Sequence, residues 1–158
     1  MIQNKHNPKS DGDLSQELTA VEKLAPRILL AEDDDEMRRL LAQELYAAGY
    51  EVIQCHDGMN FLACLESFII NKATLDFELI ISDILMPGLT GLEIFEDLHE
   101  YKGFPPTILI TAFGDENIRR KAEQLGAVAM FDKPFEIDDL LSKVREVMPP
   151  RTAYRSKK

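Results

Sequence analysis

The sequence predicts an α/β fold, a doubly wound sheet of five parallel strands with helices on both faces. Short apolar runs alternate with segments of helical periodicity, and the alternation continues from residue 27 to residue 148. Strands joined through helices run parallel and are connected by right-handed crossovers. For five such units in a row the common strand order is 2-1-3-4-5, which we expect here.

The expected strands are short runs rich in Ile, Leu and Val. Continuous apolar runs of this length indicate strands that are buried on both faces. We place the five strands at 27–31, 51–55, 79–83, 107–111 and 128–131. With the order above, this is the topology of flavodoxin-like folds, in which the carboxyl ends of the strands form the functional edge.

Each expected strand is followed by a stripe of apolar residues at helical spacing. The first stripe contains Met37, Leu41 and Leu45, and Gly49 ends it, as glycine commonly does at a helix C-terminus. The other stripes place helices near 61–69, 91–101, 118–125 and 137–147.

Composition divides the chain into three parts. We expect a mobile N-terminal extension at 1–26, one folded domain at 27–148 and a basic tail at 149–158. The net charge is −10 and the folded part is its most acidic region, which argues against direct contact with nucleic acid. No apolar run reaches the roughly 18–20 residues of a membrane helix, so we expect no membrane insertion.

Two further features concern the compartment. The N-terminus has no apolar core of a secretory signal. The two cysteines, Cys55 and Cys64, lack the close spacing of a ligand motif. Both observations favour a reduced, cytoplasmic location.

Charged and hydroxyl side chains stand at the carboxyl ends of four expected strands. They are Glu32 and Asp33 after the first, Asp83 at the end of the third, Thr111 at the end of the fourth, and Lys133 after the fifth. The strand order makes the first and third strands neighbours, so the three carboxylates should converge.

Converging carboxylates repel one another and call for a cation. Hard oxygen ligands suit Mg²⁺, which is bound through one or two carboxylates and keeps several waters. A nearby lysine and threonine suit the oxygens of a phosphoryl group, and Asp83 is then a candidate nucleophile. The set predicts a phosphoryl-transfer site.

Taken alone, the run EDDDE at 32–36 has an ordinary interpretation, since acidic residues favour a solvated loop or a helix N-terminus. Within it we assign Asp35 as the helix cap and Asp34 as an additional acid outside the metal pair.

The segments EDD (32–34), DILMPGLTGLE (83–93), TA (111–112) and KPF (133–135) resemble the receiver domain of bacterial two-component response regulators, in particular the stand-alone, chemotaxis-regulator-like ones. The resemblance covers about residues 27–148. It implies that Asp83 is the phosphoacceptor and that Lys133, before a cis proline, pairs with the phosphoryl group.

The resemblance also implies a metal set and a relay. Mg²⁺ would be held by Asp83, by Asp33 directly, by Glu32 through water and by the backbone carbonyl of Leu85. Thr111 would shift toward the phosphoryl group and start the conformational change.

Two positions depart from the family pattern. Met130 stands where the family often has an aromatic switch residue, three positions before Lys133. We expect either that its flexible thioether fills the same space or that the coupling to Thr111 is looser. Leu85 and Phe113 stand where side chains influence attack by water. Neither orients a water molecule, so we expect slow self-dephosphorylation.

The expected function is a phosphorylation-controlled switch that is no enzyme beyond its own phosphorylation and dephosphorylation. Its partners would be a histidine kinase or phosphotransfer protein as donor and a downstream protein target, with the chain a monomer or weak dimer. The chain is alternatively a receiver from a hybrid kinase or larger regulator.

Two other functions fit the topology less well. An aspartate-nucleophile phosphatase needs a second Asp where Leu85 stands. A flavin-binding domain needs a phosphate-cradling loop where EDDDE stands.

Overall fold

The computed structural model describes residues 25–70 and 77–151. In this part of the chain five parallel strands form one sheet of order β2-β1-β3-β4-β5, which confirms the predicted topology. Most of the expected N-terminal extension and of the basic tail lies outside the described residues.

The strands are short and have nearly the bounds expected from the apolar runs. They are β1 (Arg27–Ala31), β2 (Glu51–Cys55), β3 (Leu79–Asp83), β4 (Thr107–Thr111) and β5 (Ala129–Asp132). Only β5 differs, because it begins and ends one residue later than expected. Every residue of β3 and β4 is buried, as expected for central strands of a covered parallel sheet.

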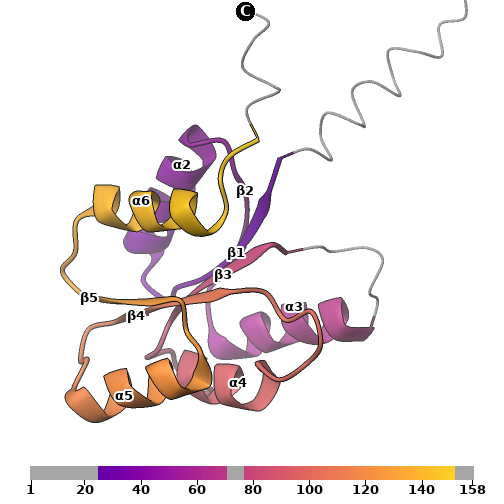
Figure 1. Cartoon of the computed structure of the whole chain (residues 1–158), viewed down its shortest axis with the longest axis vertical. Helices are drawn as coiled ribbons and strands as arrows, with labels where there is room; N and C mark the ends of the chain where they lie inside the picture. Colours follow the sequence, from indigo (N-terminus) through magenta and orange to yellow (C-terminus); the bar gives the residue numbers. More distant parts are fainter. Residues whose placement is uncertain (1–24, 71–76, 152–158) are drawn as a thin grey trace, which may run out of the picture.

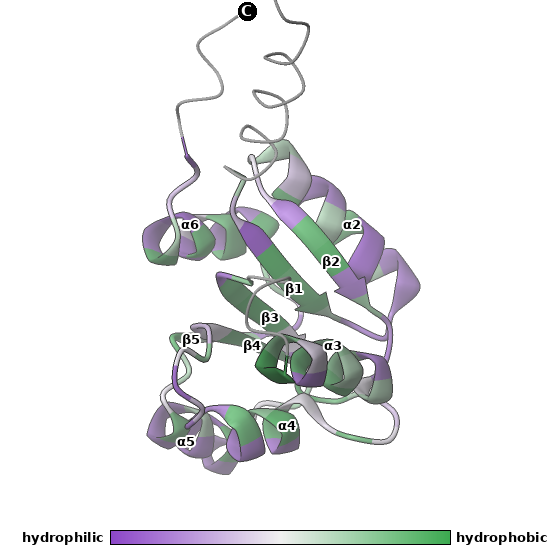
Figure 2. Ribbon diagram, turned by 90° about the vertical axis from the view of Figure 1, so that its right-hand side faces the viewer, coloured by the Kyte–Doolittle hydropathy of each residue, from purple (hydrophilic) through white to green (hydrophobic). Residues whose placement is uncertain are grey.

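Helices cover the sheet on both faces. They are α2 (Asp35–Ala47), α3 (Gly58–Ile70), α4 (Gly91–Leu98), α5 (Glu116–Leu125) and α6 (Ile137–Val147). Figure 1 shows α2 and α6 on one face and α3, α4 and α5 on the other. In Figure 2 hydrophobic strands fill the centre, and the helices carry their hydrophilic stripes on the outside.

Alternate side chains of β1 belong to the two layers of the core, one on each face of the sheet. Ile28 and Leu30 pack on the side of α2 and α6, whereas Leu29 and Ala31 pack on the side of α3 and α4. Side chains of successive strand residues point to opposite faces, so one apolar run serves both layers. The result is a rigid sheet whose carboxyl edge is fixed from both sides.

Three helix ends differ most clearly from the sequence expectations. The helix α3 begins at Gly58, about three residues early. The N-cap of α2 is Asp34 and not Asp35, because the Asp34 side chain accepts a hydrogen bond from the Met37 N–H. Asp35 instead lies in the first turn and pairs with Arg38. The helix α4 ends at Leu98, about three residues early, where His99 is the C-cap and its ring lies against the carbonyls of Phe95 and Glu96.

Candidate functional site

Carboxylates meet where β1 and β3 end side by side. Asp83 is the last residue of β3 and is only 3% exposed, and Glu32 follows β1 and is 0% exposed. Asp33 is exposed beside them. One carboxylate oxygen from each of the three lies within 4.8 Å of the others. We call these three residues the acidic cluster.

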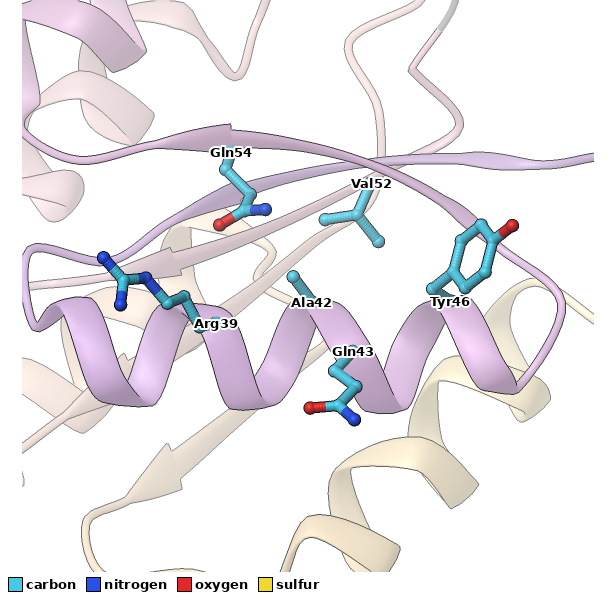
Figure 3. A pocket seen from close by; sticks show the side chains of 6 residues that line it. All are labelled: Arg39, Ala42, Gln43, Tyr46, Val52 and Gln54. Atoms are coloured by element: carbon cyan, nitrogen blue, oxygen red, sulfur yellow. The ribbon is translucent and has the colours of Figure 1, made fainter.

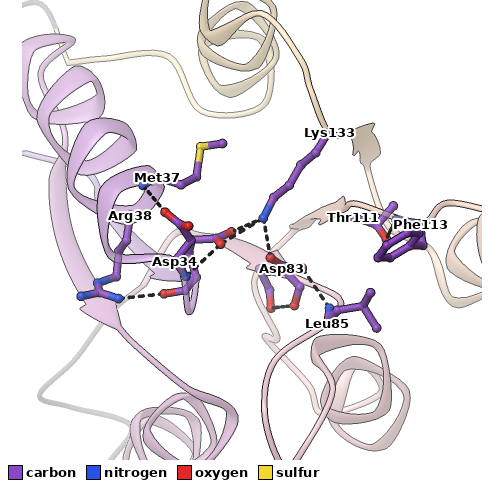
Figure 4. Close-up of polar contacts among 10 residues, drawn as sticks. Asp34, Met37, Arg38, Asp83, Leu85, Thr111, Phe113 and Lys133 are labelled. Atoms are coloured by element: carbon purple, nitrogen blue, oxygen red, sulfur yellow. Dashed lines mark hydrogen bonds and ion pairs between the residues drawn. The ribbon is translucent and has the colours of Figure 1, made fainter.

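A single ammonium group bridges the two buried carboxylates. The Nζ of Lys133, which follows β5, donates to Asp83 Oδ2 at 2.7 Å and to both carboxylate oxygens of Glu32 at 3.0 Å. Figure 4 shows the Lys133 side chain reaching across to Asp83. The lysine thereby joins the ends of β1, β3 and β5, and the Lys133–Pro134 peptide bond is cis, as the family resemblance implies.

Burial and mutual contact change the acidities of this group. Burial and the neighbouring Asp83 together raise the pKa of the Glu32 carboxyl to about 7, while Lys133 acts in the opposite direction. Burial by itself lowers the pKa of the Lys133 ammonium, but its hydrogen bonds to Asp83 and Glu32 outweigh that effect and the pKa is raised. The lysine therefore stays charged, and the pKa of Glu32 lies close to neutral pH.

Backbone groups hold Asp83 in place. The Leu85 N–H donates to Asp83 Oδ1 at 2.9 Å, so both oxygens of the Asp83 carboxylate are engaged. At Gly91, the first residue of α4, a Cβ would lie 2.2 Å from the carbonyl oxygen of Asp83. Only glycine lets α4 approach β3 this closely.

One supporting residue was missed by the sequence reasoning. Arg38 Nη1 on α2 donates to the carbonyl oxygen of Glu32 at 3.0 Å and so fixes the turn after β1. The spacing to Asp34, the N-cap, could have indicated this contact. Residues four positions apart lie on the same face of a helix, so the Arg38 side chain lies above the first turn.

Thr111 is the last residue of β4 and is buried. Its Oγ1 accepts a hydrogen bond from the Phe113 N–H at 3.1 Å, and its carbonyl accepts one from the Lys133 N–H at 2.7 Å. The Phe113 ring is 74% exposed and the Leu85 side chain 41% exposed. Figure 4 shows Thr111 with Phe113 on one side of Asp83, opposite the start of α2.

Met130 of β5 faces α4 and α5 from the inside of the molecule. It packs against an apolar cluster that includes Leu109, Phe95 and Ala122. Its neighbour Phe131 points to the opposite face, toward α2 and α6, and lies against Phe135. The Met130 thioether thus occupies a partly buried position in this layer of the core.

Two shallow grooves lie along α2. One borders the site, because Lys133 contributes to it together with Asp34, Glu36, Met37 and Leu40. The other lies between α2 and the edge strand β2 and contains none of the predicted site residues (Figure 3). It is lined by Arg39, Ala42, Gln43, Tyr46, Val52 and Gln54.

Comparison with known proteins agrees with this geometry. The family model for the response regulator receiver domain matches residues 28–145. The chain belongs to the receiver domain family of two-component response regulators. The matched residues include the two edge strands of the sheet, β2 and β5. They also include every residue of the acidic cluster, as well as Thr111 and Lys133.

Curated relatives contain this receiver domain in different settings. The C4-dicarboxylate transport transcriptional regulatory protein DctD of Pseudomonas aeruginosa is 34% identical over 126 residues, which are 79% of this chain and 26% of that protein. Sporulation initiation phosphotransferase F of Bacillus subtilis is 29% identical over 123 residues, 78% of this chain and 94% of that protein. The chain spans half or less of the first four curated relatives it matches.

Solved receiver structures share the fold. The chemotaxis response regulator CheY4 of Vibrio cholerae has a TM-score of 0.67 at 27% identity, covering 78% of this chain and 99% of that one. The response regulator TrrA of Thermotoga maritima, solved in complex with Mg²⁺ and BeF, has a TM-score of 0.65 at 31% identity, with coverages of 78% and 99%. Among the described residues of this receiver domain, no helix is long and apolar enough to cross a membrane.

Proposed function

We propose that this receiver domain is switched by transfer of a phosphoryl group to Asp83. The observation that carries the proposal is the Asp83 carboxylate, which lies at the end of a central strand between a lysine ammonium and two further carboxylates. In the transfer, an Asp83 oxygen attacks phosphorus while the bond to the donor breaks, and the product is an acyl phosphate.

The acidic cluster fits a divalent cation. Three carboxylate oxygens within 4.8 Å of one another form a hard donor set of the kind Mg²⁺ prefers. We assign Asp33 and Asp83 as direct ligands, Glu32 as a ligand through water and the Leu85 carbonyl as a fourth group. When bound, Mg²⁺ supplies positive charge that offsets the carboxylates and the incoming phosphoryl oxygens.

The remaining residues orient the phosphoryl group and relay its presence to the rest of the domain. Lys133 contributes its ammonium to the phosphoryl oxygens, and it already lies 2.7 Å from the Asp83 oxygen. The Thr111 hydroxyl gives up the hydrogen bond that it accepts from the Phe113 N–H and donates one to a phosphoryl oxygen instead. Loss of the contact with Phe113 releases the loop after β4. Met130 accommodates the change in the core, and Leu85 and Phe113 shield the acyl phosphate from water.

The donor class is a histidine kinase or a phosphotransfer protein, and the output is contact with a downstream protein, without direct contact to nucleic acid. Receiver domains are signalling domains, and we assign this one no reaction beyond its own phosphorylation and dephosphorylation. An aspartate-nucleophile phosphatase is not favoured, because Leu85 occupies the position of that family's second Asp.

Intact mass measurement tests the proposal. The protein is incubated with Mg²⁺ and acetyl phosphate, and a single added phosphoryl group is expected. Asp83→Asn should abolish the adduct, whereas Asp97→Asn, on the exposed part of α4, should keep it. Wild-type protein without an adduct, or an adduct that persists in Asp83→Asn, would overturn the assignment.

A further inference from the structure

Two cysteines that lie nine positions apart in the sequence meet in the fold. Cys55 is the last residue of β2, and Cys64 lies in the middle of α3. Both are free thiols, and their sulfur atoms are 3.5 Å apart, with one thiol donating to the other. A disulfide bond is about 2.05 Å long, so closure by about 1.5 Å joins them.

The two thiols differ in their access to solvent. Cys55 is fully buried beneath α3 in the apolar cluster that also holds Phe61 and Leu65, and Cys64 is partly exposed at its margin. Burial raises the pKa of the Cys55 thiol, and the adjacent Cys64 raises it further. Cys64 is therefore the thiol that a dissolved oxidant meets first, and Cys55 is placed to resolve the product.

We propose that Cys55 and Cys64 form a redox modification site, a reversible disulfide made by exchange with a small disulfide of the glutathione class. The Cys64 thiolate attacks one sulfur of the oxidant, a mixed disulfide forms and one glutathione thiolate leaves. The Cys55 sulfur then attacks the Cys64 sulfur, and the second glutathione leaves as a thiolate that takes up the Cys55 proton. Two protein thiols are oxidised and one small disulfide is reduced.

The crosslink would join the end of β2 to α3 close to the acidic cluster. The carbonyl oxygen of Cys55 accepts a hydrogen bond from the Glu32 N–H at 3.1 Å, so the cysteine backbone also positions the turn after β1. Joining a strand end to the following helix restricts the unfolded chain. The oxidised protein should therefore have a higher melting temperature than the reduced one.

The site is tested with oxidised glutathione on the folded, full-length chain, followed by alkylation and intact mass measurement. Wild type should become lighter by two hydrogens without a retained glutathione, and dithiothreitol should reverse the change. Cys55→Ala should retain one glutathione on Cys64. Cys64→Ser, a substitution at a partly exposed position, should remain unmodified because Cys55 is buried.

Three results would overturn the inference. They are a wild-type protein that retains glutathione on Cys64, a disulfide found between two chains instead of within one, and a reaction that occurs only after unfolding. A disulfide that leaves the melting temperature unchanged would refute the restraint on β2 and α3. The readouts are thiol mass and melting of metal-free protein, so their failure is independent of the phosphoryl-transfer proposal.

Discussion

The two sides of Asp83 are built on different principles. On one side, which we call the charged side, Glu32 and Asp33 follow β1 and Lys133 binds two buried carboxylates. On the other, the hydroxyl side, the Thr111 Oγ1 accepts one hydrogen bond, from the Phe113 N–H, and Phe113 is largely exposed. The charged side is a dense set of ionic contacts, whereas the hydroxyl side has few contacts to lose.

The difference has a physical cause. Buried carboxylates are stable only with a cation and hydrogen bonds close by, so the charged side must be fixed in the resting protein. A neutral hydroxyl exchanges one hydrogen bond for another at small net free energy. The comparison implies that ion and phosphoryl binding depend on the charged side, and that motion begins on the hydroxyl side.

The largest expected effect comes from removing the cation of the charged side. Lys133→Met leaves Glu32 and Asp83 buried without their ammonium, and the free energy of unfolding of metal-free protein should fall by about 2 kcal/mol. The loss stays below that of a fully trapped ion pair, because Glu32 takes up a proton. Urea unfolding in a chelator measures the change.

A surface lysine provides the matched control. Lys143 pairs with the exposed Glu146 on α6, so Lys143→Met should change the free energy of unfolding by less than about 0.5 kcal/mol. Equal effects of the two substitutions would show that Lys133 does not neutralise the carboxylates.

The charged side should also make magnesium binding depend on pH. With a pKa of about 7, Glu32 is mostly protonated at pH 6 and mostly ionised at pH 8. Because protons and Mg²⁺ compete for the acidic cluster, the apparent affinity should rise by about fivefold to tenfold over this range, as follows from a group that titrates at its centre. Titration at constant ionic strength measures the affinity.

Glu32→Gln separates this residue from the rest of the acidic cluster. The variant keeps the shape of the side chain but has no proton to exchange, so the pH dependence between 6 and 8 should become flat. A slope that survives in the variant would assign the titration to another group.

The strands of the sheet could be predicted well because each one is specified by its own short stretch of sequence. Buried parallel strands are continuous apolar runs, and four of the five have the expected bounds. The convergence of Asp83 with Glu32 and Asp33 followed from the strand order, which makes β1 and β3 neighbours. The cap of α2 was assigned one residue late, since neighbouring acids in EDDDE all suit a cap and only the hydrogen bond to Met37 distinguishes Asp34.

Contacts made by long side chains, or between separate helices and strands, could not be predicted from the sequence. The hydrogen bonds from Lys133 to both Glu32 and Asp83 depend on rotamers, and so does the reach of Arg38 to Glu32. The contact of Cys55 with Cys64 depends on how α3 packs on β2, which no spacing rule in the chain specifies.

A smaller effect is expected where the hydroxyl side meets solvent. Leu85→Asn places an amide that binds water beside Asp83, and the acyl phosphate should hydrolyse about threefold to fivefold faster, a barrier change of below 1 kcal/mol. Loss of the phosphoryl group is followed by intact mass after the donor is removed. Ile70→Asn, an equally polar change on exposed α3, should leave the rate unaltered. An unchanged rate in Leu85→Asn would refute shielding.

The smallest effect on the free energy of unfolding is expected at Phe113. It tests whether this residue stabilises the resting fold. Its ring is 74% exposed, so Phe113→Ala should change the free energy of unfolding by less than about 0.5 kcal/mol. Met130, which packs in the apolar cluster with Phe95, Leu109 and Ala122, is the control, and Met130→Ala should cost about 1–2 kcal/mol through lost packing. Both are measured by urea unfolding of metal-free protein. A large loss at Phe113 would mean that its ring holds the loop closed in the resting state, and the hydroxyl side would then be as firmly fixed as the charged side.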